Sequence, residues 1–304
     1  MTEYAATPPN TPSNGASRRR KHDQGGRAGS EKNTWERMSS RFFRDTAKYG
    51  VKPLEWLGRY LPSGADDGPL SPTADEVAGA EQRMIADPVS LPRPVLVLAG
   101  WRAWPMQVHA LSQRLGELTG DPTRFHPVAY PGAGSVEKAA DRVLAETQDK
   151  FGRHLRSIDV VAISMGGLVA RYLGTPEWLG GHETPLPIRR LYTLGTPHAG
   201  AKLADTIALD TASRQMRPGS AFLSRMNEAL PSCGFELTPY AVLNDTWVGA
   251  KNSAPPGWAP IWTRGSAFMS HFIASTQPAI IADVALRLRG EAPLASVGSE
   301  PPTD

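Results

Sequence analysis

The chain has 304 residues, of which 40% are hydrophobic, and this is enough for one large α/β domain with appendages or for two small domains. The formal net charge is +3, and residues 1–33 account for all of it, because they hold six of the 33 basic and three of the 30 acidic side chains. The remaining 27 basic and 27 acidic side chains make residues 34–304 neutral overall, so nucleic-acid binding by the main body is not expected.

Cysteine and hydropathy bound the class of protein further. Cys233 is the only cysteine, so no internal disulfide can form, and the scattered histidines predict no metal site. Residues 1–29 lack the apolar core of a signal peptide, and no stretch of about 18 apolar residues occurs anywhere. These features predict a soluble, cytoplasmic protein that needs neither a metal nor another cofactor.

The chain is predicted to begin with segments that lie outside the main domain. Residues 1–33 are rich in Pro, Gly and Ser and should form a disordered basic tail; its cluster 18–21 leaves contact with anionic lipid or nucleic acid open, although a solvated tail is favoured. Residues 34–91 are interpreted as a helical extension and linker, with helical periodicity over 34–61 and a short helix over 75–86. Packing of this extension on the main domain is favoured over a membrane surface, because its polar face is of mixed charge.

The main domain is predicted to span residues 92–290, before a second disordered tail over 291–304. Five apolar segments predict buried strands, at 95–99, 126–130, 158–163, 191–194 and 240–243, with a sixth strand at 261–263. Helices are expected between most of the strands, at 107–118, 136–151, 168–173 and 278–288. This alternation predicts an α/β fold with a mostly parallel, doubly wound sheet of six or more strands, whose chemistry lies at the carboxyl ends of the strands.

The most informative run is Val-Val-Ala-Ile-Ser-Met-Gly-Gly at 160–167, in which a buried strand delivers Ser164 into a tight strand-to-helix turn. Small residues, Ala162 and Gly166, occupy the positions two before and two after the serine, as such a turn requires. The turn lifts the hydroxyl above the sheet and directs the backbone N–H of Met165 at the same spot, which is half of an oxyanion hole. The run predicts a serine hydrolase.

A serine hydroxyl is a poor nucleophile unless an imidazole takes its proton and a carboxylate orients that imidazole. Asp245 follows the fifth predicted strand, and His271 lies in the loop after the sixth. We therefore assign Ser164 as nucleophile, His271 as general base and then acid, and Asp245 as the orienting carboxylate. The backbone N–H of Trp101, just after the first strand, is the expected second oxyanion donor.

These motifs resemble the α/β-hydrolase superfamily and, within it, the lipase and esterase branch. The resemblance covers about residues 92–290 and includes a histidine ahead of the last helix. Its sequence motifs are Ala-Ile-Ser-Met-Gly-Gly at 162–167, Thr-Leu-Gly-Thr-Pro-His-Ala-Gly at 193–200, the segment 216–223 and Asp-Thr-Trp-Val at 245–248. Two positions depart from the family pattern. Ala162 stands where a glycine is usual, and Ala99-Gly100 replaces a frequent His-Gly pair.

Rival residues fit the expected roles less well. Three other carboxylates, those of Asp205, Asp210 and Glu236, follow no convincing strand. His198 lies just past a strand end, but a base there would precede the acid, against the family order, so we interpret it as a supporting or pocket-lining residue. The predicted substrate pocket also contains Gly100, Arg102, Trp104 and Pro197.

The sequence thus predicts hydrolysis of a carboxylic ester with a lipid or other apolar acyl group, through an acyl-enzyme. Thioesterase, amidase and acyltransferase activities would use the same residues. A hydrolase-like scaffold without turnover, which binds a partner through the N-terminal helices, is the alternative from another class. Residues 201–237 are interpreted as either a mobile lid or a fixed helical cap. Transient contact with a membrane surface and the oligomeric state are left open.

Overall fold

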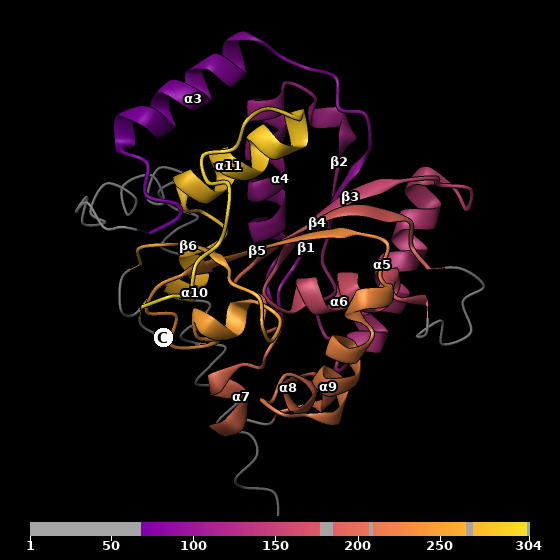
Figure 1. The fold of residues 1–304 in the computed structure, drawn as a ribbon. Coiled ribbons are helices and arrows are strands. Elements are labelled where there is room, and N and C mark those ends of the chain that lie inside the picture. The colour runs from indigo at the N-terminus through magenta and orange to yellow at the C-terminus, as the bar shows by residue number, and fades with distance from the viewer. Residues whose placement is uncertain (1–67, 177–184, 207–208, 266–269, 303–304) are drawn as a thin grey trace, which may run out of the picture. The chain divides into compact units, whose positions relative to one another are not determined.

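The computed structural model describes residues 68–302, apart from 177–184, 207–208 and 266–269 (Figure 1). The tail predicted at 1–33 and the helical stretch predicted at 34–61 lie outside the described residues. Among the described helices, none combines the length and the hydropathy that crossing a bilayer demands.

Six parallel strands form one sheet in the order β2-β1-β3-β4-β5-β6. The strands are β1 (Val95–Leu98), β2 (Phe125–Val128), β3 (Ile158–Ile163), β4 (Ile188–Leu194), β5 (Glu236–Val242) and β6 (Ile261–Thr263). The predicted parallel α/β architecture is therefore confirmed. Both β4 and β5 begin earlier than predicted, because their first residues are mostly polar and partly exposed and carry little apolar signal.

Helices cover both faces of the sheet (Figure 1). Helices α3 (Ala74–Ala86), α4 (Pro105–Thr119) and α11 (Pro278–Arg289) pack together on one face, and α5 (Val136–Phe151) and α6 (Met165–Gly174) pack together on the other. The chain steps from β1 to β2 in one direction and from β2 to β3 in the other, so right-handed crossovers place α4 and α5 on opposite faces. This reversal makes the crevice between β1 and β3 the topological switch point of the sheet.

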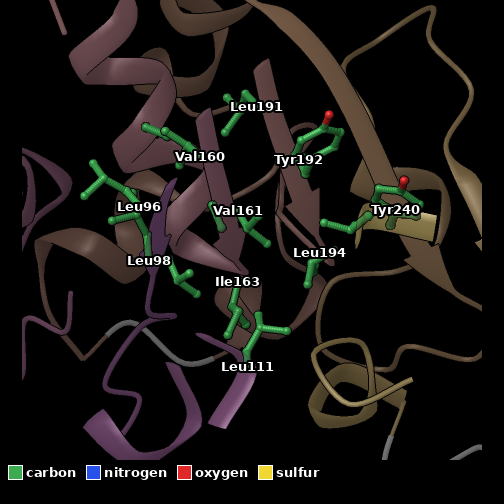
Figure 2. Close-up of a cluster of buried hydrophobic side chains, with 14 of the residues drawn as sticks. Leu96, Leu98, Leu111, Val160, Val161, Ile163, Leu191, Tyr192, Leu194 and Tyr240 are labelled. Atoms are coloured by element: carbon green, nitrogen blue, oxygen red, sulfur yellow. The ribbon is translucent and has the colours of Figure 1, made fainter. Parts of the chain in front are cut away.

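The core lies on the central strands. Apolar side chains of β1, β3 and β4 fill the space between the sheet and its helices (Figure 2). Every residue of β3 is buried, as expected for a parallel strand that is covered on both faces. The strand that precedes Ser164 is therefore firmly packed and gives the serine a rigid base.

Short helices gather beyond the carboxyl ends of the strands (Figure 1). Helices α7 (Lys202–Thr206), α8 (Thr211–Gln215) and α9 (Ala221–Glu228) follow β4, and α10 (Ser270–Ile273) follows β6. The described part of the chain also contains 3-10 helices at Pro122–Arg124, Leu230–Ser232 and Lys251–Ser253. The segment 201–237 is thus largely helical where it is described, except that its last two residues already belong to β5.

The ordered domain extends beyond the predicted boundaries at 92 and 290. Leu70 is fully buried, its N–H donates to the carbonyl of Trp262 in β6, and α3 adds Met84 to the core. After α11, the N–H groups of Leu294 and Ala295 donate to the buried carboxylate of Asp283. The structure describes the segment predicted as a disordered tail through residue 302. The sequence did not reveal this, because the polar composition of the segment gives no sign of the hydrogen-bond acceptor that α11 provides.

The C-terminal segment is also hydrogen-bonded to β6 and to the residue before it. The N–H of Ser299 donates to the carbonyl of Pro260, and the indole of Trp262 donates to the Ser299 hydroxyl at 2.9 Å. Gly298 passes so close that a Cβ would lie 2.3 Å from the carbonyl oxygen of Ala259, so only glycine fits there. The edge strand β6 is therefore contacted by residues from both the beginning and the end of the domain.

Candidate active site

Ser164 sits at the bend between β3 and α6 in a strained conformation, with φ 51° and ψ −124°. A positive φ costs a non-glycine residue about 1–3 kcal/mol, so neighbouring contacts must hold it. The Ser164 N–H donates to the carbonyl of Leu194 at 2.8 Å, and the hydroxyl of Thr196 donates to the Ser164 carbonyl at 2.7 Å. The bend is thus fastened to the end of the neighbouring strand β4.

The two glycines after the serine allow α6 to begin against the strand ends. A Cβ on Gly166 would lie 2.6 Å from the carbonyl oxygen of Ala99, and one on Gly167 would lie 2.2 Å from the Thr196 hydroxyl oxygen. Carbonyl oxygens of the backbone cannot swing aside as a side chain can. The glycine at 166 is therefore required by the approach of α6 to the end of β1, a reason that the local sequence does not contain.

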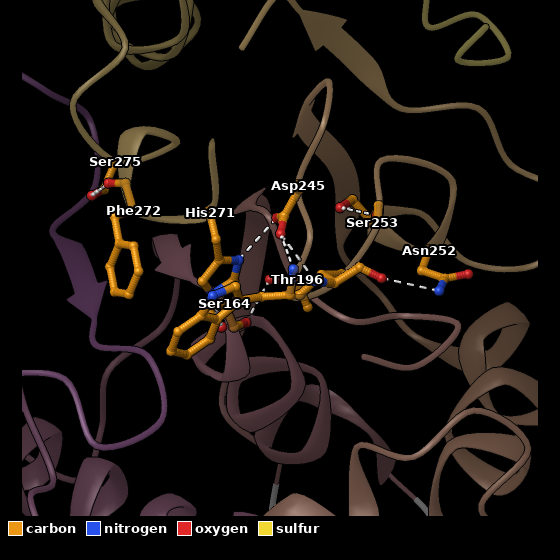
Figure 3. A network of polar contacts seen from close by, with 11 residues as sticks. Ser164, Thr196, Asp245, Asn252, Ser253, His271, Phe272 and Ser275 are labelled. Atoms are coloured by element: carbon orange, nitrogen blue, oxygen red, sulfur yellow. Dashed lines mark hydrogen bonds and ion pairs between the residues drawn. The ribbon is translucent and has the colours of Figure 1, made fainter. Parts of the chain in front are cut away.

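Ser164, His271 and Asp245 form a hydrogen-bonded array (Figure 3). His271 Nε2 lies 3.1 Å from Ser164 Oγ, and His271 Nδ1 lies 2.9 Å from Asp245 Oδ2. An ionised carboxylate only accepts hydrogen bonds, so Nδ1 carries the proton and Nε2 is left to accept from the serine hydroxyl. The structure therefore brings together the three side chains that the sequence assigned to this role.

Asp245 is fixed by its own backbone turn. Its Oδ1 accepts the N–H groups of Trp247 at 2.9 Å and Val248 at 3.0 Å, while Oδ2 faces the imidazole. Burial by itself raises the pKa of the Asp245 carboxyl, but the hydrogen bond and charge of His271 and the two N–H donors lower it below the ordinary value. The group can therefore remain ionised beside the imidazole over the physiological range.

The lowered pKa predicts how stability depends on pH. Because the folded-state pKa is depressed, the ionised Asp245 contributes stability above its unfolded pKa, and that contribution is lost as the pH falls through the folded value. We expect Asp245→Asn to lower the free energy of unfolding by about 1–3 kcal/mol at neutral pH, and the difference from wild type to shrink below about pH 4. Urea unfolding at neutral pH and at about pH 5 and 3.5 measures this.

The exposed substitution Asp149→Asn in α5 is the control for a general effect of removing one negative charge. A difference between Asp245→Asn and wild type that stays constant, or grows, between about pH 5 and pH 3.5 would contradict the expectation.

Aromatic rings surround the imidazole. The indole of Trp247 is stacked on His271 with a centroid distance of 5.4 Å and an interplanar angle of 7°, and Phe272 meets both rings edge-on. An aromatic face stabilises a cation above it, so this shell suits an imidazole that becomes charged during a reaction. The sequence did not reveal this role of Trp247, because only folding brings it against His271.

The chain after β1 passes directly beside the serine. A Cβ on Gly100 would lie 3.2 Å from Ser164 Cβ and 3.7 Å from Ser164 Oγ. The buried hydroxyl of Tyr130 donates to the carbonyl of Ala99, which holds the start of this loop. Met165 is the first residue of α6, so its N–H has no partner within the helix. The two predicted oxyanion donors, on Trp101 and Met165, thus follow directly on Gly100 and Ser164.

The residues predicted to line the pocket separate into different places. Gly100 borders Ser164, and Trp104 is 53% exposed at the start of α4. Arg102 has φ 52°, and its guanidinium lies 3.5 Å from Asp210. Pro197 and His198 are buried, so neither presents an open surface for a ligand.

Both ring nitrogens of the buried His198 form hydrogen bonds within the domain. Its Nε2 lies 3.0 Å from the Thr193 hydroxyl, and its Nδ1 lies 3.0 Å from an Arg171 guanidinium nitrogen. Burial and the nearby Arg171 charge hold the pKa of His198 well below its ordinary value. His198 is therefore a neutral structural side chain. Its nitrogens point to α6 and β4, which fits the supporting role that the sequence left open as one alternative and not the pocket-lining role.

Arg171 is a buried residue that sequence reasoning missed. From α6 its guanidinium donates to His198 Nδ1, to the Met226 carbonyl at 2.6 Å and to the Asn227 amide oxygen at 3.0 Å. Burial lowers the pKa of Arg171 to about 10. The side chain ties α9 to the helix that starts at the serine. An arginine within the apolar run of α6 is the sequence signal that could have revealed this buried charge.

Among the described residues, no cluster of metal-binding side chains occurs at Ser164, and one cavity lies elsewhere in the domain. Where the chain is described, no three His, Cys, Asp or Glu side chains are placed to hold a metal ion. A cavity of about 570 Å³ is lined by residues that precede the strands, including Pro94, Arg124 and Leu155. It therefore lies at the amino edge of the sheet, away from the serine.

Comparisons with known proteins identify the fold. No protein-family model and no curated protein sequence matches the chain. Among solved structures, Bacillus licheniformis lipase BlEst2 in its propeptide form matches with a TM-score of 0.50 and 14% identity over 70% of this chain and 55% of that one. Aspergillus fumigatus lipase B matches with a TM-score of 0.50 and 13% identity over 76% of this chain and 60% of that one.

The matched region thus spans little more than half the length of these two lipases. At such low identity the likeness shows the fold alone. The chain has the α/β-hydrolase fold that its sequence motifs resemble.

Proposed function

We propose that this chain is a serine hydrolase that cleaves carboxylic esters with an apolar acyl group. The observation that carries the proposal is the array Ser164–His271–Asp245, with distances of 3.1 and 2.9 Å, at the switch point of a parallel sheet. A serine in a positive-φ bend, next to an imidazole whose other nitrogen is fixed by an ionised carboxylate, is an arrangement suited to acyl transfer.

The proposed reaction proceeds in two halves. His271 Nε2 takes the proton as Ser164 Oγ attacks the ester carbonyl, and the N–H groups of Met165 and Trp101 stabilise the oxyanion. His271 then gives the proton to the departing alcohol, which leaves an acyl-enzyme. Water, deprotonated by His271, attacks the acyl carbon, and the carboxylic acid departs as Ser164 regains its proton. Each oxyanion donor is worth about 3 kcal/mol in such a step.

The preference for an apolar acyl group is supported by exposed apolar side chains at the start of α4 and beside His271. Large exposed apolar side chains occur at Trp104 and Met106 at the start of α4, and at Phe272 beside His271. A hydrogen bond of 2.8 Å from Gln107 to Ser275 links the start of α4 to the segment that follows Phe272. Exposed apolar side chains of this kind favour a substrate that buries hydrocarbon on binding.

Two measurements test the proposal. The first is labelling with a fluorophosphonate probe, which we expect at Ser164 in the wild-type protein and not in Ser164→Ala. The second is hydrolysis of p-nitrophenyl esters from acetate to palmitate, for which we expect kcat/KM to rise with acyl length over the first few methylene groups. Each buried methylene contributes about 0.8 kcal/mol, which corresponds to about four-fold.

Ser224→Ala, an exposed change in α9, is the matched control for replacing a serine. Absence of label together with absence of turnover would refute the serine hydrolase. A kcat/KM that is flat or falls with acyl length would refute the apolar preference alone. Faster cleavage of matched thioesters, or transfer of the acyl group to an added alcohol in preference to water, would redirect the proposal to a thioesterase or an acyltransferase.

A further inference from the structure

Asp210 joins the loop after β1 to the helices that follow β4. Its Oδ2 accepts the indole N–H of Trp101 at 3.1 Å and lies 3.5 Å from a guanidinium nitrogen of Arg102. Its Oδ1 accepts the N–H of Ser213 at 2.8 Å, so the same carboxylate caps α8. One side chain therefore connects two segments that are about a hundred residues apart in sequence.

The loop that Asp210 holds is strained. Arg102 has φ 52°, a conformation that costs a non-glycine residue about 1–3 kcal/mol and needs outside contacts to persist. Trp101 lies between this residue and Gly100, where an added Cβ would come within 3.2 Å of Ser164 Cβ. The peptide plane between Trp101 and Arg102 is joined through the Trp101 Cα to the Gly100–Trp101 peptide, which carries the Trp101 N–H, so a rearrangement of the loop that relieved Arg102 would also disturb that N–H.

The carboxylate itself is anchored. The Ser213 hydroxyl accepts the N–H of Asp210 at 3.0 Å, which completes a capping box. Helix α8 is also tied to the loop after β2, because the N–H of Ala212 donates to the Gly134 carbonyl and the N–H of Val136 donates to the Gln215 amide oxygen. Asp210 thus lies at the start of a short helix that is hydrogen-bonded to the rest of the domain near its first and last residues.

We propose that Asp210 is a positioning residue, whose hydrogen bond to the Trp101 indole keeps the backbone N–H of Trp101 aimed at the oxyanion formed at Ser164. The inference rests on the proposed function, because an oxyanion arises only if the protein performs acyl transfer. The contribution of the Arg102 ion pair is small, since Arg102 is about half exposed and the distance is long. The bond to the indole, which is partly buried, carries the effect.

Two small substitutions, Asp210→Asn and Trp101→Phe, test whether the hydrogen bond between the two side chains positions the Trp101 N–H. In Asp210→Asn, an asparagine oxygen that keeps the cap of α8 by accepting the N–H of Ser213 places the amide NH2 group against the Trp101 indole N–H, which loses its acceptor. Trp101→Phe removes the indole N–H and keeps an aromatic ring and the backbone N–H. We expect each variant to lower kcat by about 10- to 100-fold and to change KM by less than about two-fold, because an oxyanion donor acts in the transition state.

The double variant tests the link between the two residues. If the effects act through one bond, Asp210→Asn combined with Trp101→Phe loses no more activity than the less active of the two singles, within about two-fold. The affinity for an alkyl boronic acid, which forms a tetrahedral adduct on the serine, should fall by the same factor as kcat. Ser213→Ala is the control, because it weakens the cap of α8 and leaves the indole bond in place; its kcat should remain within about two-fold of wild type.

Three results would overturn the inference: wild-type kcat in both single variants, additive losses in the double variant, or an equal loss of kcat in Ser213→Ala. If Asp210→Asn does not fold, Trp101→Phe alone decides by its effect on kcat and on boronic acid affinity. These outcomes are distinct from failure of the proposed function, in which the wild-type protein itself takes no fluorophosphonate label and cleaves no ester.

Discussion

Replacing His271 by glutamine lowers kcat by about 10⁴- to 10⁶-fold, and adding Ser164→Ala to that variant lowers it little further. Glutamine can still donate an amide proton to Asp245, but it cannot take the proton of the serine hydroxyl, which lies 3.1 Å from His271 Nε2 in the native site. Residues that act as one unit lose their effect together, so the losses do not add. Steady-state hydrolysis of p-nitrophenyl butyrate by the single and double variants measures this.

The exposed His154→Ala is the control for replacing a histidine, and thermal unfolding shows that each variant is folded. Retention of more than about 1% of the wild-type kcat in His271→Gln would mean that another group acts as base. His198 could not fill that role without leaving its place, because it is fully buried and both of its ring nitrogens are engaged.

Arg171→Met destabilises the protein by about 2–4 kcal/mol. The substitution keeps an unbranched side chain in α6 but leaves His198 Nδ1, the Met226 carbonyl and the Asn227 amide oxygen without the guanidinium donor. Each buried acceptor that loses its partner costs about 1–3 kcal/mol, while removal of a buried charge returns part of this. The free energy of unfolding in urea gives the net value.

Arg225→Met, an exposed change on α9, should alter the free energy of unfolding by less than about 0.5 kcal/mol. If Arg171→Met is as stable as wild type, the desolvation cost of the guanidinium equals the value of its hydrogen bonds. In that case α9 is held by its apolar contacts, such as those of the buried Leu223 and Met226.

The nucleophile was predictable because its sequence signal is local, although some of the contacts that hold it come from β1 and β4. A buried strand, a serine and two glycines are adjacent in sequence, and the order of strand ends then pointed to Asp245 and His271. The other contacts depend on tertiary structure. Asp210 was considered only as a rival acid, and its bond to Trp101 joins elements that no periodicity relates. Arg171 lies in a predicted helix, but its acceptors come from α9 and the loop after β4.

The contacts of residues 291–302 with the rest of the domain were hidden from sequence reasoning for a similar reason. Residues 291–302 have the polar, proline-containing composition of a tail, yet Asp283 provides a buried acceptor for two of their N–H groups. Tyr240 donates to the same carboxylate, so the segment after α11 depends on a side chain of β5 as well. Composition measures whether a segment can fold alone, and this segment folds on a surface that the rest of the chain prepares.

The segments around Leu70 and Ser299, which lie beside β6, are also expected to prevent this edge strand from pairing with a second copy of the chain. A strand at the border of a sheet offers unpaired N–H and C=O groups, which can recruit a strand from another molecule and start aggregation. Here the N–H of Leu70 donates to the carbonyl of Trp262, and the N–H of Ser299 donates to the carbonyl of Pro260 just before the strand. Removing either segment would uncover this border, and the expected consequence is self-association at high concentration even while the reacting groups remain intact.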